Sequence, residues 1–206
     1  VSSMGVTAFQ DIKKETPQTQ DATQQKYVRC VAAAITGQVR DPEAPKQWEV
    51  IVFQDDTPNA FALPGGKIGV HTGILKIAKN QDQLATVLGH EVAHVLAQHA
   101  NERVSQQLVT GVLMEAAGQT LDPTLVAALG MGAQVGVLLP FSRTQESEAD
   151  LLGLGLMAGA GFDPRESTKF WKNMEAAGGD KTPEFLSTHP SDQTRAAALQ
   201  GRIAQE

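Results

Sequence analysis

The sequence predicts an α+β fold that is mostly helical and has a small β-sheet early in the chain. Apolar residues recur at helical spacing in several segments, whereas β-branched and aromatic residues gather in one short segment, residues 48–54 (WEVIVFQ). With 206 residues, 41% of them hydrophobic, the chain can form one globular core. We expect an N-terminal helical arm, residues 1–40, followed by one domain, residues 41–206.

The sheet is expected to follow a helix at about residues 21–35. Residues 48–54 are predicted to form a strand. Residues 60–63 and 67–71 are predicted to be extended segments on either side of a Pro-Gly-Gly turn, residues 64–66. Proline and glycine weaken a central strand, so these segments indicate an edge strand or a bulged hairpin.

A long helix is predicted next, with Asn80 as its N-cap and its end near Val109. Residues 110–140 are rich in Ala, Gly and Leu and predict one or two further helices, broken near Asp122. Glycines, Gln134 and a proline interrupt the apolar part, which favours a buried or interfacial helix over a membrane span. The same stretch could be a lid, a surface for unfolded protein or plain core.

The last third of the chain carries helix start signals. Ser142 followed by Gln145 has the capping-box pattern, and the helix that it opens should end near residues 159–161. Pro164 is expected at the first position of another helix, and a final helix should follow Ser191.

Charge and cysteine content exclude two classes of site. Seventeen basic and twenty-three acidic residues give a net charge of −6, which argues against a nucleic-acid-binding protein. Cys30 is the single cysteine, so neither an intramolecular disulfide nor a cysteine-based zinc site can form. The chain starts at Val1 rather than Met, which leads us to expect that a signal or anchor segment has been removed.

The run His90-Glu91-Val92-Ala93-His94 is the strongest functional signal. Residues four apart on a helix are separated by about 40° around the axis, so His90 and His94 share a face and can chelate one zinc ion. Glu91 is displaced by about 100° and can accept a proton from a water at the metal without ligating it. The pattern can also arise by chance, but its apolar surroundings favour a site.

A third ligand is expected from the helix that starts at Ser142. Glu146 and Asp150 are four residues apart and share a face, whereas Glu148 points elsewhere. We expect Glu146 to ligate the metal and Asp150 to hold the outer nitrogen of a ligand histidine. The alternative for this cluster is a solvated acidic helix start.

These motifs together resemble the HtpX and CAAX-prenyl-protease family of zinc metallopeptidases, within the gluzincins. The resemblance rests on HEVAH at residues 90–94, E-x-x-A-D at 146–150, NAFALPGG at 59–66, and THPS at 188–191 followed by Arg195. It covers roughly residues 45–200 and implies a zincin-like metallopeptidase domain with one Zn²⁺ per chain.

The absence of transmembrane segments makes the soluble periplasmic BepA/LoiP-like branch of that family the nearest likeness. This branch implies a periplasmic lipoprotein that associates with the outer membrane through a lipid anchor. It also implies quality control of unfolded or misassembled envelope proteins.

Three further histidines and one arginine have open roles. His189 could donate to the oxyanion, bind as a fourth ligand or cap the last helix, and in the family branch the matching histidine is implicated in blocking the metal. Arg195 could orient a carboxylate or the oxyanion, or lie on a helix surface. His99 is about 140° around the predicted helix from His94 and is expected to be structural or exposed, and His71 structural.

Substrate binding is expected at the segment Ala60, Phe61, Ala62 and Leu63, because a peptide can add to an edge strand through main-chain hydrogen bonds. The alternative is an ordinary hairpin. The leading hypothesis is a zinc endopeptidase whose partner is a protein or peptide. The competing one is a chaperone or assembly factor with a latched zinc site, and Glu91 favours the enzyme, because a pure binder needs no base.

Overall fold

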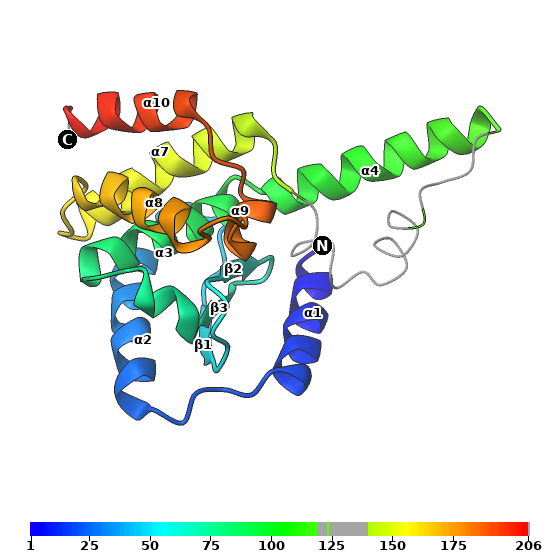
Figure 1. Ribbon diagram of the computed structural model, residues 1–206. Helices are drawn as coiled ribbons and strands as arrows, with labels where there is room; N and C mark the ends of the chain where they lie inside the picture. The colour runs from blue at the N-terminus through cyan, green and yellow to red at the C-terminus, as the bar shows by residue number, and fades with distance from the viewer. Residues whose placement is uncertain (119–122, 124–139, 206) are drawn as a thin grey trace.

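The structure, a computed structural model, describes residues 1–118, 123 and 140–205 (Figure 1). It confirms a mostly helical α+β fold with a small sheet. The elements in chain order are α1 (Ser2–Glu15), α2 (Ala22–Thr36), β1 (Glu49–Phe53), β2 (Ala60–Leu63), β3 (Lys67–His71), the 3-10 helix η1 (Thr72–Lys76), α3 (Gln81–Leu96), α4 (His99–Ala116), α7 (Arg143–Gly159), α8 (Glu166–Ala177), α9 (Glu184–Thr188) and α10 (Gln193–Ile203).

Side-chain caps set the starts of several helices, and two of these caps, Asn80 and Ser142, are those that the sequence predicts. Asn80 accepts a hydrogen bond from the backbone N–H of the third residue of α3. Ser142 and Gln145 form both hydrogen bonds of a capping box at the start of α7. Asp21 and Asp192 cap α2 and α10. The two helices that carry the metal-binding motifs therefore begin at defined residues.

The sheet has the order β1-β3-β2, with β1 parallel and β2 antiparallel to the central β3. The turn between β2 and β3 contains Gly65 and Gly66 with φ of +93° and +78°, a backbone region that side chains rarely adopt. The prediction of an edge strand next to this turn is confirmed, because β2 pairs with β3 alone within the sheet.

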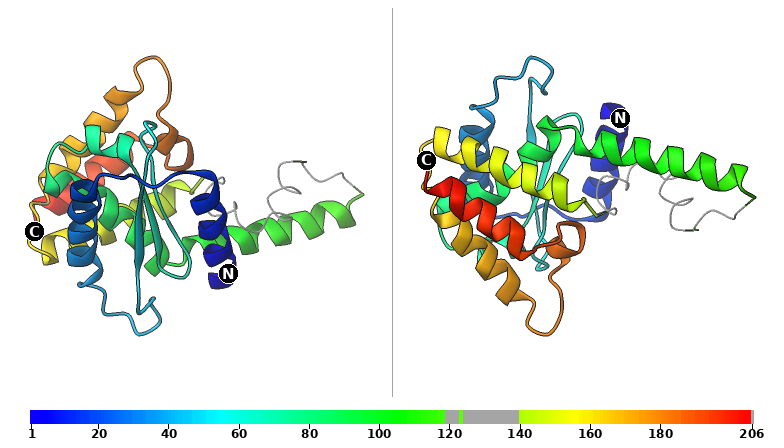
Figure 2. Two further views of the ribbon diagram at one scale, coloured as in Figure 1. Left: turned by 90° about the horizontal axis from the view of Figure 1, so that it is seen from below. Right: turned by 90° about the horizontal axis from the view of Figure 1, so that it is seen from above.

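Each face of the sheet is covered by helices (Figure 2, left). On one face α1 packs Phe9 against Phe53 and Phe61, with ring centroids 6.0 and 6.4 Å apart. The other face joins the main core, to which α2 contributes residues such as Val28 and Ile35. The division into an arm of residues 1–40 and a separate domain stays a prediction.

Helices α3 and α7 cross at two glycines. A Cβ atom on Gly89 would lie 2.8 Å from the carbonyl oxygen of Gly153, and one on Gly153 would lie 2.7 Å from the backbone nitrogen of His90. Larger residues at either position would push the helices apart, because contacts this short essentially never occur. The crossing brings the two halves of the metal-binding motif together.

The single helix predicted from Asn80 to Val109 is wrong. Helix α3 ends at Leu96, and α4 starts at His99, after Gln98 has adopted the left-handed conformation (φ 56°, ψ 33°). A non-glycine residue rarely has positive φ, so nothing in the residue types here predicts the break. The break redirects the chain and changes the position of His99.

Two smaller differences concern the last third of the chain. The helix predicted to start at Pro164 begins two residues later, at Glu166, because the Asp163 side chain accepts a hydrogen bond from the backbone N–H of Arg165 and forms a turn. The loop predicted at residues 188–190 begins one residue later, because Thr188 is the last residue of the short helix α9 and His189 is its C-cap.

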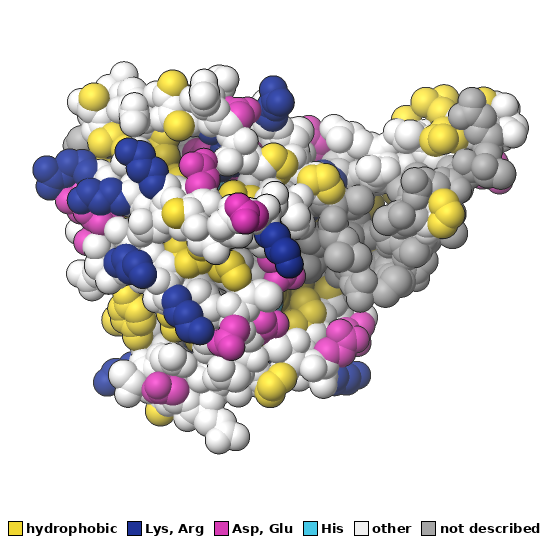
Figure 3. All heavy atoms as spheres, viewed as in Figure 1, with side chains coloured by type: hydrophobic (Ala, Val, Ile, Leu, Met, Phe, Trp, Pro, Cys, Tyr) yellow, Lys and Arg dark blue, Asp and Glu magenta, His cyan; other side chains and the backbone are white. Residues whose placement is uncertain are grey.

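Helix α4 projects from the body of the molecule, and apolar side chains gather at its far end (Figures 1 and 3). Leu108, Val109, Val112 and Leu113 are 49–66% exposed, so the described part of residues 110–140 does not form core. Of the one or two helices predicted for residues 110–140, the described part includes the end of α4, and the predicted break near Asp122 lies outside the described residues. Across the described ranges, no helix has the length and hydropathy needed to cross a bilayer.

Glu166 links the start of α8 to the start of α3. Its carboxylate accepts hydrogen bonds from Lys169, Asn80 and Gln83, which lower the pKa of Glu166 to about 2. The folded pKa is below the unfolded value, so the stabilisation is present above about pH 4.5 and is lost as the pH falls towards 2.

We therefore expect a Glu166→Gln variant to be less stable than the wild type at pH 7. The difference should shrink steadily between pH 4.5 and pH 2, because protonation gives the wild type the same neutral side chain. Urea unfolding of both proteins across this range measures it. A difference that is the same at every pH would show that the charge of Glu166 contributes nothing.

Candidate metal centre

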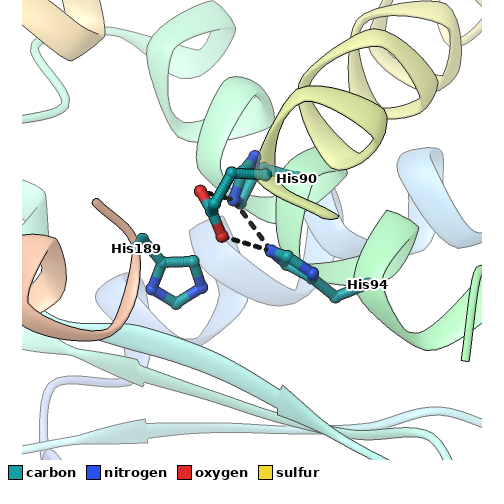
Figure 4. Close-up of side chains that lie close together, drawn as sticks. His90, His94 and His189 are labelled. Atoms are coloured by element: carbon teal, nitrogen blue, oxygen red, sulfur yellow. Dashed lines mark hydrogen bonds and ion pairs between the residues drawn. The ribbon is translucent and has the colours of Figure 1, made fainter. Parts of the chain in front are cut away.

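Four buried side chains converge between α3, α7 and α9. One ligand atom from each of His90, His94, Glu146 and His189 lies within 4.8 Å of the others. The first two come from α3, Glu146 from α7, and His189 from the residue that follows α9. Figure 4 shows the three histidine rings arranged around a common point. Three segments far apart in the sequence thus supply one candidate metal-binding group.

Distances within this group fit the expectation that His90 and His94 share a helix face. Their Nε2 atoms lie 3.0 Å apart, and they lie 3.2 and 2.9 Å from the two carboxylate oxygens of Glu146. The Glu146 side chain is completely buried, and its carboxylate is paired with the two histidines and with Arg195, whose Nη1 lies 2.9 Å from Oε2. Two imidazole nitrogens and a carboxylate that face one another in a buried site form a ligand set for a divalent cation.

The residues fit a zinc ion. Two histidine nitrogens that each lie 2.0–2.1 Å from a tetrahedral zinc ion are about 3.3 Å apart, close to the separation of the Nε2 atoms of His90 and His94. Imidazole and carboxylate ligands are those that zinc takes in catalytic sites. Three ligands, His90, His94 and Glu146, would leave one position for His189 or for water.

Burial and charge act together on these groups. Burial raises the pKa of Glu146, but the nearby histidines outweigh it and lower that pKa far below its usual range. Burial lowers the pKa of His90, but Glu146 and Asp150 outweigh it and raise that pKa to about 10. Burial also lowers the pKa of His94 well below its usual value. In the metal-free protein the Glu146 carboxylate is therefore charged and His94 neutral, whereas His90 is protonated and would release its proton when a metal binds.

Asp150 and Arg195 lie directly behind the ligands. Asp150 Oδ1 is 2.9 Å from Nδ1 of His90, on the side of the ring away from Glu146. The Arg195 guanidinium donates hydrogen bonds to both oxygens of Asp150, at 2.7 and 2.9 Å, and its Nη1 lies 2.9 Å from Glu146 Oε2. Arg195 is buried, so the alternative that it lies on a helix surface is wrong.

Glu91 lies outside the ligand group, between the group and the sheet. Its Oε2 accepts a hydrogen bond of 3.1 Å from the backbone N–H of Ala62 in the edge strand β2. Its Oε1 is 3.1 Å from Nε2 of His189. The side chain is buried, so the carboxylate is held beside the site rather than in it.

Sequence reasoning missed three residues that surround His94. The Phe141 ring stacks on His94 with a centroid distance of 3.7 Å, and the guanidinium of the buried Arg103 lies 3.5 Å from the Phe141 centroid. Burial lowers the pKa of Arg103 to about 10. His99 contacts His94 directly. The helix break at Gln98, which the sequence does not signal, brings His99 into place.

A groove of about 550 Å³ opens beside His94. It is bordered by the β2–β3 turn, by the end of α3 and by the loop before β1. Ala62 and Pro64 line it on one side, and Gln98 and Phe141 on the other. The groove therefore lies between a residue of β2 and a residue of the ligand group. His71 lies apart, at the end of β3, where Thr57 and Asp55 contact its ring.

Comparison with known proteins agrees with this geometry. The model of peptidase family M48 matches residues 22–203. The chain belongs to peptidase family M48. This confirms the predicted metallopeptidase family and places the motif of His90 and His94 within the matched region.

The chain is similar to proteins that are named as metalloendopeptidases or proteases. It is 44% identical over 151 residues to the mitochondrial metalloendopeptidase OMA1 of Schizosaccharomyces pombe. The matched segment covers 72% of this chain and 44% of the relative. OMA1 of Arabidopsis thaliana is 41% identical over 77% of the chain and 32% of the relative. The β-barrel assembly-enhancing protease of Escherichia coli is 26% identical over 98% of the chain and 43% of the relative. The chain thus spans less than half the length of these relatives.

Proposed function

We propose that the protein is a zinc-dependent endopeptidase. The observation that carries this proposal is Glu91, a buried carboxylate that lies beside the ligand group without belonging to it. A site that only binds zinc needs no such residue, whereas hydrolysis needs a base that stays free of the metal. We assign His90, His94 and Glu146 as metal ligands, and Asp150 as the partner that fixes the His90 ring.

Bound zinc would supply a Lewis acid that polarises a peptide carbonyl and acidifies water. Glu91 would accept the proton of the attacking water and pass it to the leaving amine. Its hydrogen bond from Ala62 holds one carboxylate oxygen in place and leaves the other, next to His189, for proton transfer. Arg195, close to both Glu146 and Asp150, would keep these carboxylates ionised and oriented.

We propose that the substrate is an extended protein segment bound along β2, at Ala60, Phe61, Ala62 and Leu63. The free side of this strand faces Glu91, since the backbone N–H of Ala62 points at that carboxylate. Main-chain pairing gives affinity with little sequence preference, which suits unfolded or misassembled envelope proteins. A periplasmic location with an outer-membrane lipid anchor stays part of this proposal, and the mitochondrial names of the OMA1 relatives point to another setting.

A second function is favoured by His189. Because this residue belongs to the ligand group, we propose that it is a reversible fourth ligand. A site in which it stayed bound to the metal would be latched, and the protein would then act as a chaperone or assembly factor. In the structure the Nε2 atom of His189 is within 3.1 Å of Glu91, so the same ring can contact the base or the metal.

Casein digestion by the zinc-loaded wild type and a Glu91→Gln variant tests the proposed enzyme. We expect the variant to bind zinc normally and to digest casein at least about 100-fold more slowly, because the amide cannot accept the proton. Bound zinc is measured in the same samples, so that loss of metal is separated from loss of the base.

Equal digestion by both proteins would refute the role of Glu91. No digestion by zinc-loaded wild type, with digestion appearing in a His189→Ala variant, would identify a latched enzyme. No digestion by either of these, with zinc bound, would favour the chaperone or assembly factor.

A further inference from the structure

His99 occupies the outer side of the His94 ring. Its Nδ1 lies 2.9 Å from Nδ1 of His94, and its Nε2 lies 2.9 Å from Oε2 of Glu148 on α7. The His99 side chain is 1% exposed, whereas that of Glu148 is 54% exposed. A chain of contacts therefore runs from the surface of α7 through a buried histidine to a proposed metal ligand.

The break between α3 and α4 creates this arrangement. On a continuous helix His99 would be about 140° around the axis from His94 and would point away from it. Because the backbone of Gln98 is left-handed, α4 starts in a new direction. His99, the first residue of α4, then contacts His94 near the end of α3. The left-handed conformation is strained for a residue other than glycine. The contact between His99 and His94 that this conformation permits compensates for the strain at Gln98.

The hydrogen positions in this chain follow from the ligand group. The Nε2 atom of His94 faces His90 and Glu146 and must be free of hydrogen to bind a metal. The hydrogen of the neutral ring is then on Nδ1, which donates to Nδ1 of His99. The His99 hydrogen is consequently on Nε2, where the Glu148 carboxylate accepts it. Each ring thus has one consistent arrangement.

We propose that His99, oriented by Glu148, is a positioning residue that fixes the tautomer and the ring plane of His94 for metal binding. This inference rests on the proposed metal site. It gives the second ligand histidine a counterpart to Asp150, which lies 2.9 Å from Nδ1 of His90. Partners of this kind hold a ligand ring in its metal-binding orientation, and their loss weakens metal affinity.

Zinc dissociation constants of variants, measured by competition with a chromophoric chelator, test this inference. His99→Leu keeps the site apolar but removes the acceptor, and we expect it to bind zinc about 10–100-fold more weakly than the wild type. His99→Asn places an amide oxygen near the former Nδ1 position. We expect His99→Asn to restore most of the zinc affinity. If the imidazole ring had only a structural role, the amide would not restore it.

Glu148→Gln is the second variant, because an exposed side chain can be changed with little risk to folding. We expect it to weaken zinc binding by a smaller factor than His99→Leu. Thermal unfolding of the metal-free proteins shows whether any variant is merely unfolded.

The outcomes separate this inference from the proposed function. Equal zinc affinity of wild type and His99→Leu would overturn the inference and leave the metal site intact. Equal weakening in His99→Leu and His99→Asn would also overturn it, because the acceptor would then be irrelevant. A wild type that binds no zinc at all would overturn the metal site itself.

Discussion

A Glu146→Gln variant is expected to bind zinc more than about 100-fold more weakly than the wild type and to lose proteolysis with it, since a direct ligand matters more than the outer partners of ligands. Glu146 is the negative charge of the proposed ligand set and is completely buried. Without it, two neutral imidazoles would have to hold a divalent cation beside the Arg195 guanidinium, whose Nη1 is 2.9 Å from the carboxylate. The chelator competition measures the loss directly.

Glu184→Gln is the matched control for this change. Glu184 is an exposed glutamate at the start of α9, so the same amide substitution there should leave zinc affinity unchanged. Wild-type affinity in Glu146→Gln would contradict the assignment of Glu146 as a ligand, because no other buried carboxylate in the described ranges lies within the group.

Substitution of Gly153 by alanine is expected to have the second large effect, because it acts on both stability and the metal. The added Cβ would lie 2.7 Å from the backbone nitrogen of His90 and 2.8 Å from the backbone of Gly89. Neither backbone can yield without moving α3 relative to α7. We expect a net destabilisation of about 1–3 kcal/mol, after the gain of about 1 kcal/mol that alanine gives inside a helix.

The same displacement should weaken zinc binding, since Glu146 is on α7 and the ligand histidines are on α3. Gly155→Ala, on the same helix, is the control. A Cβ atom there meets nothing within 4 Å, so this variant should be more stable than the wild type by roughly 0.5–1 kcal/mol. Denaturant unfolding and zinc titration of both variants compare them. Similar behaviour of the two would show that the glycine contact does not set the helix spacing.

The parts of the site that could be predicted lie within single helices. The spacing of His90 and His94, and of Glu146 and Asp150, follows from helical periodicity. The capping box at Ser142 sets where the second of these helices starts. Local rules therefore identified which residues share a face, and the resemblance to a metallopeptidase family indicated that the two faces meet.

The parts that could not be predicted depend on tertiary contacts. The positive φ of Gln98 has no signature in the sequence, so the predicted helix ran through it and His99 was placed on the wrong side. The two glycines at the helix crossing look like ordinary weak helix formers, and nothing local shows that Gly89 and Gly153 contact each other. The burial of Arg195 depends on Asp150, 45 residues earlier in the chain.

The central claim is that His90, His94 and Glu146 hold the metal while Glu91 stays free of it. Anomalous diffraction at the zinc edge, from crystals of the zinc-loaded protein, tests this most directly. We expect one peak at about 2.0–2.1 Å from Nε2 of both histidines and about 2.0–2.2 Å from a Glu146 oxygen, with no oxygen of Glu91 at bonding distance. A peak elsewhere, or one that Glu91 ligates, would contradict the claim.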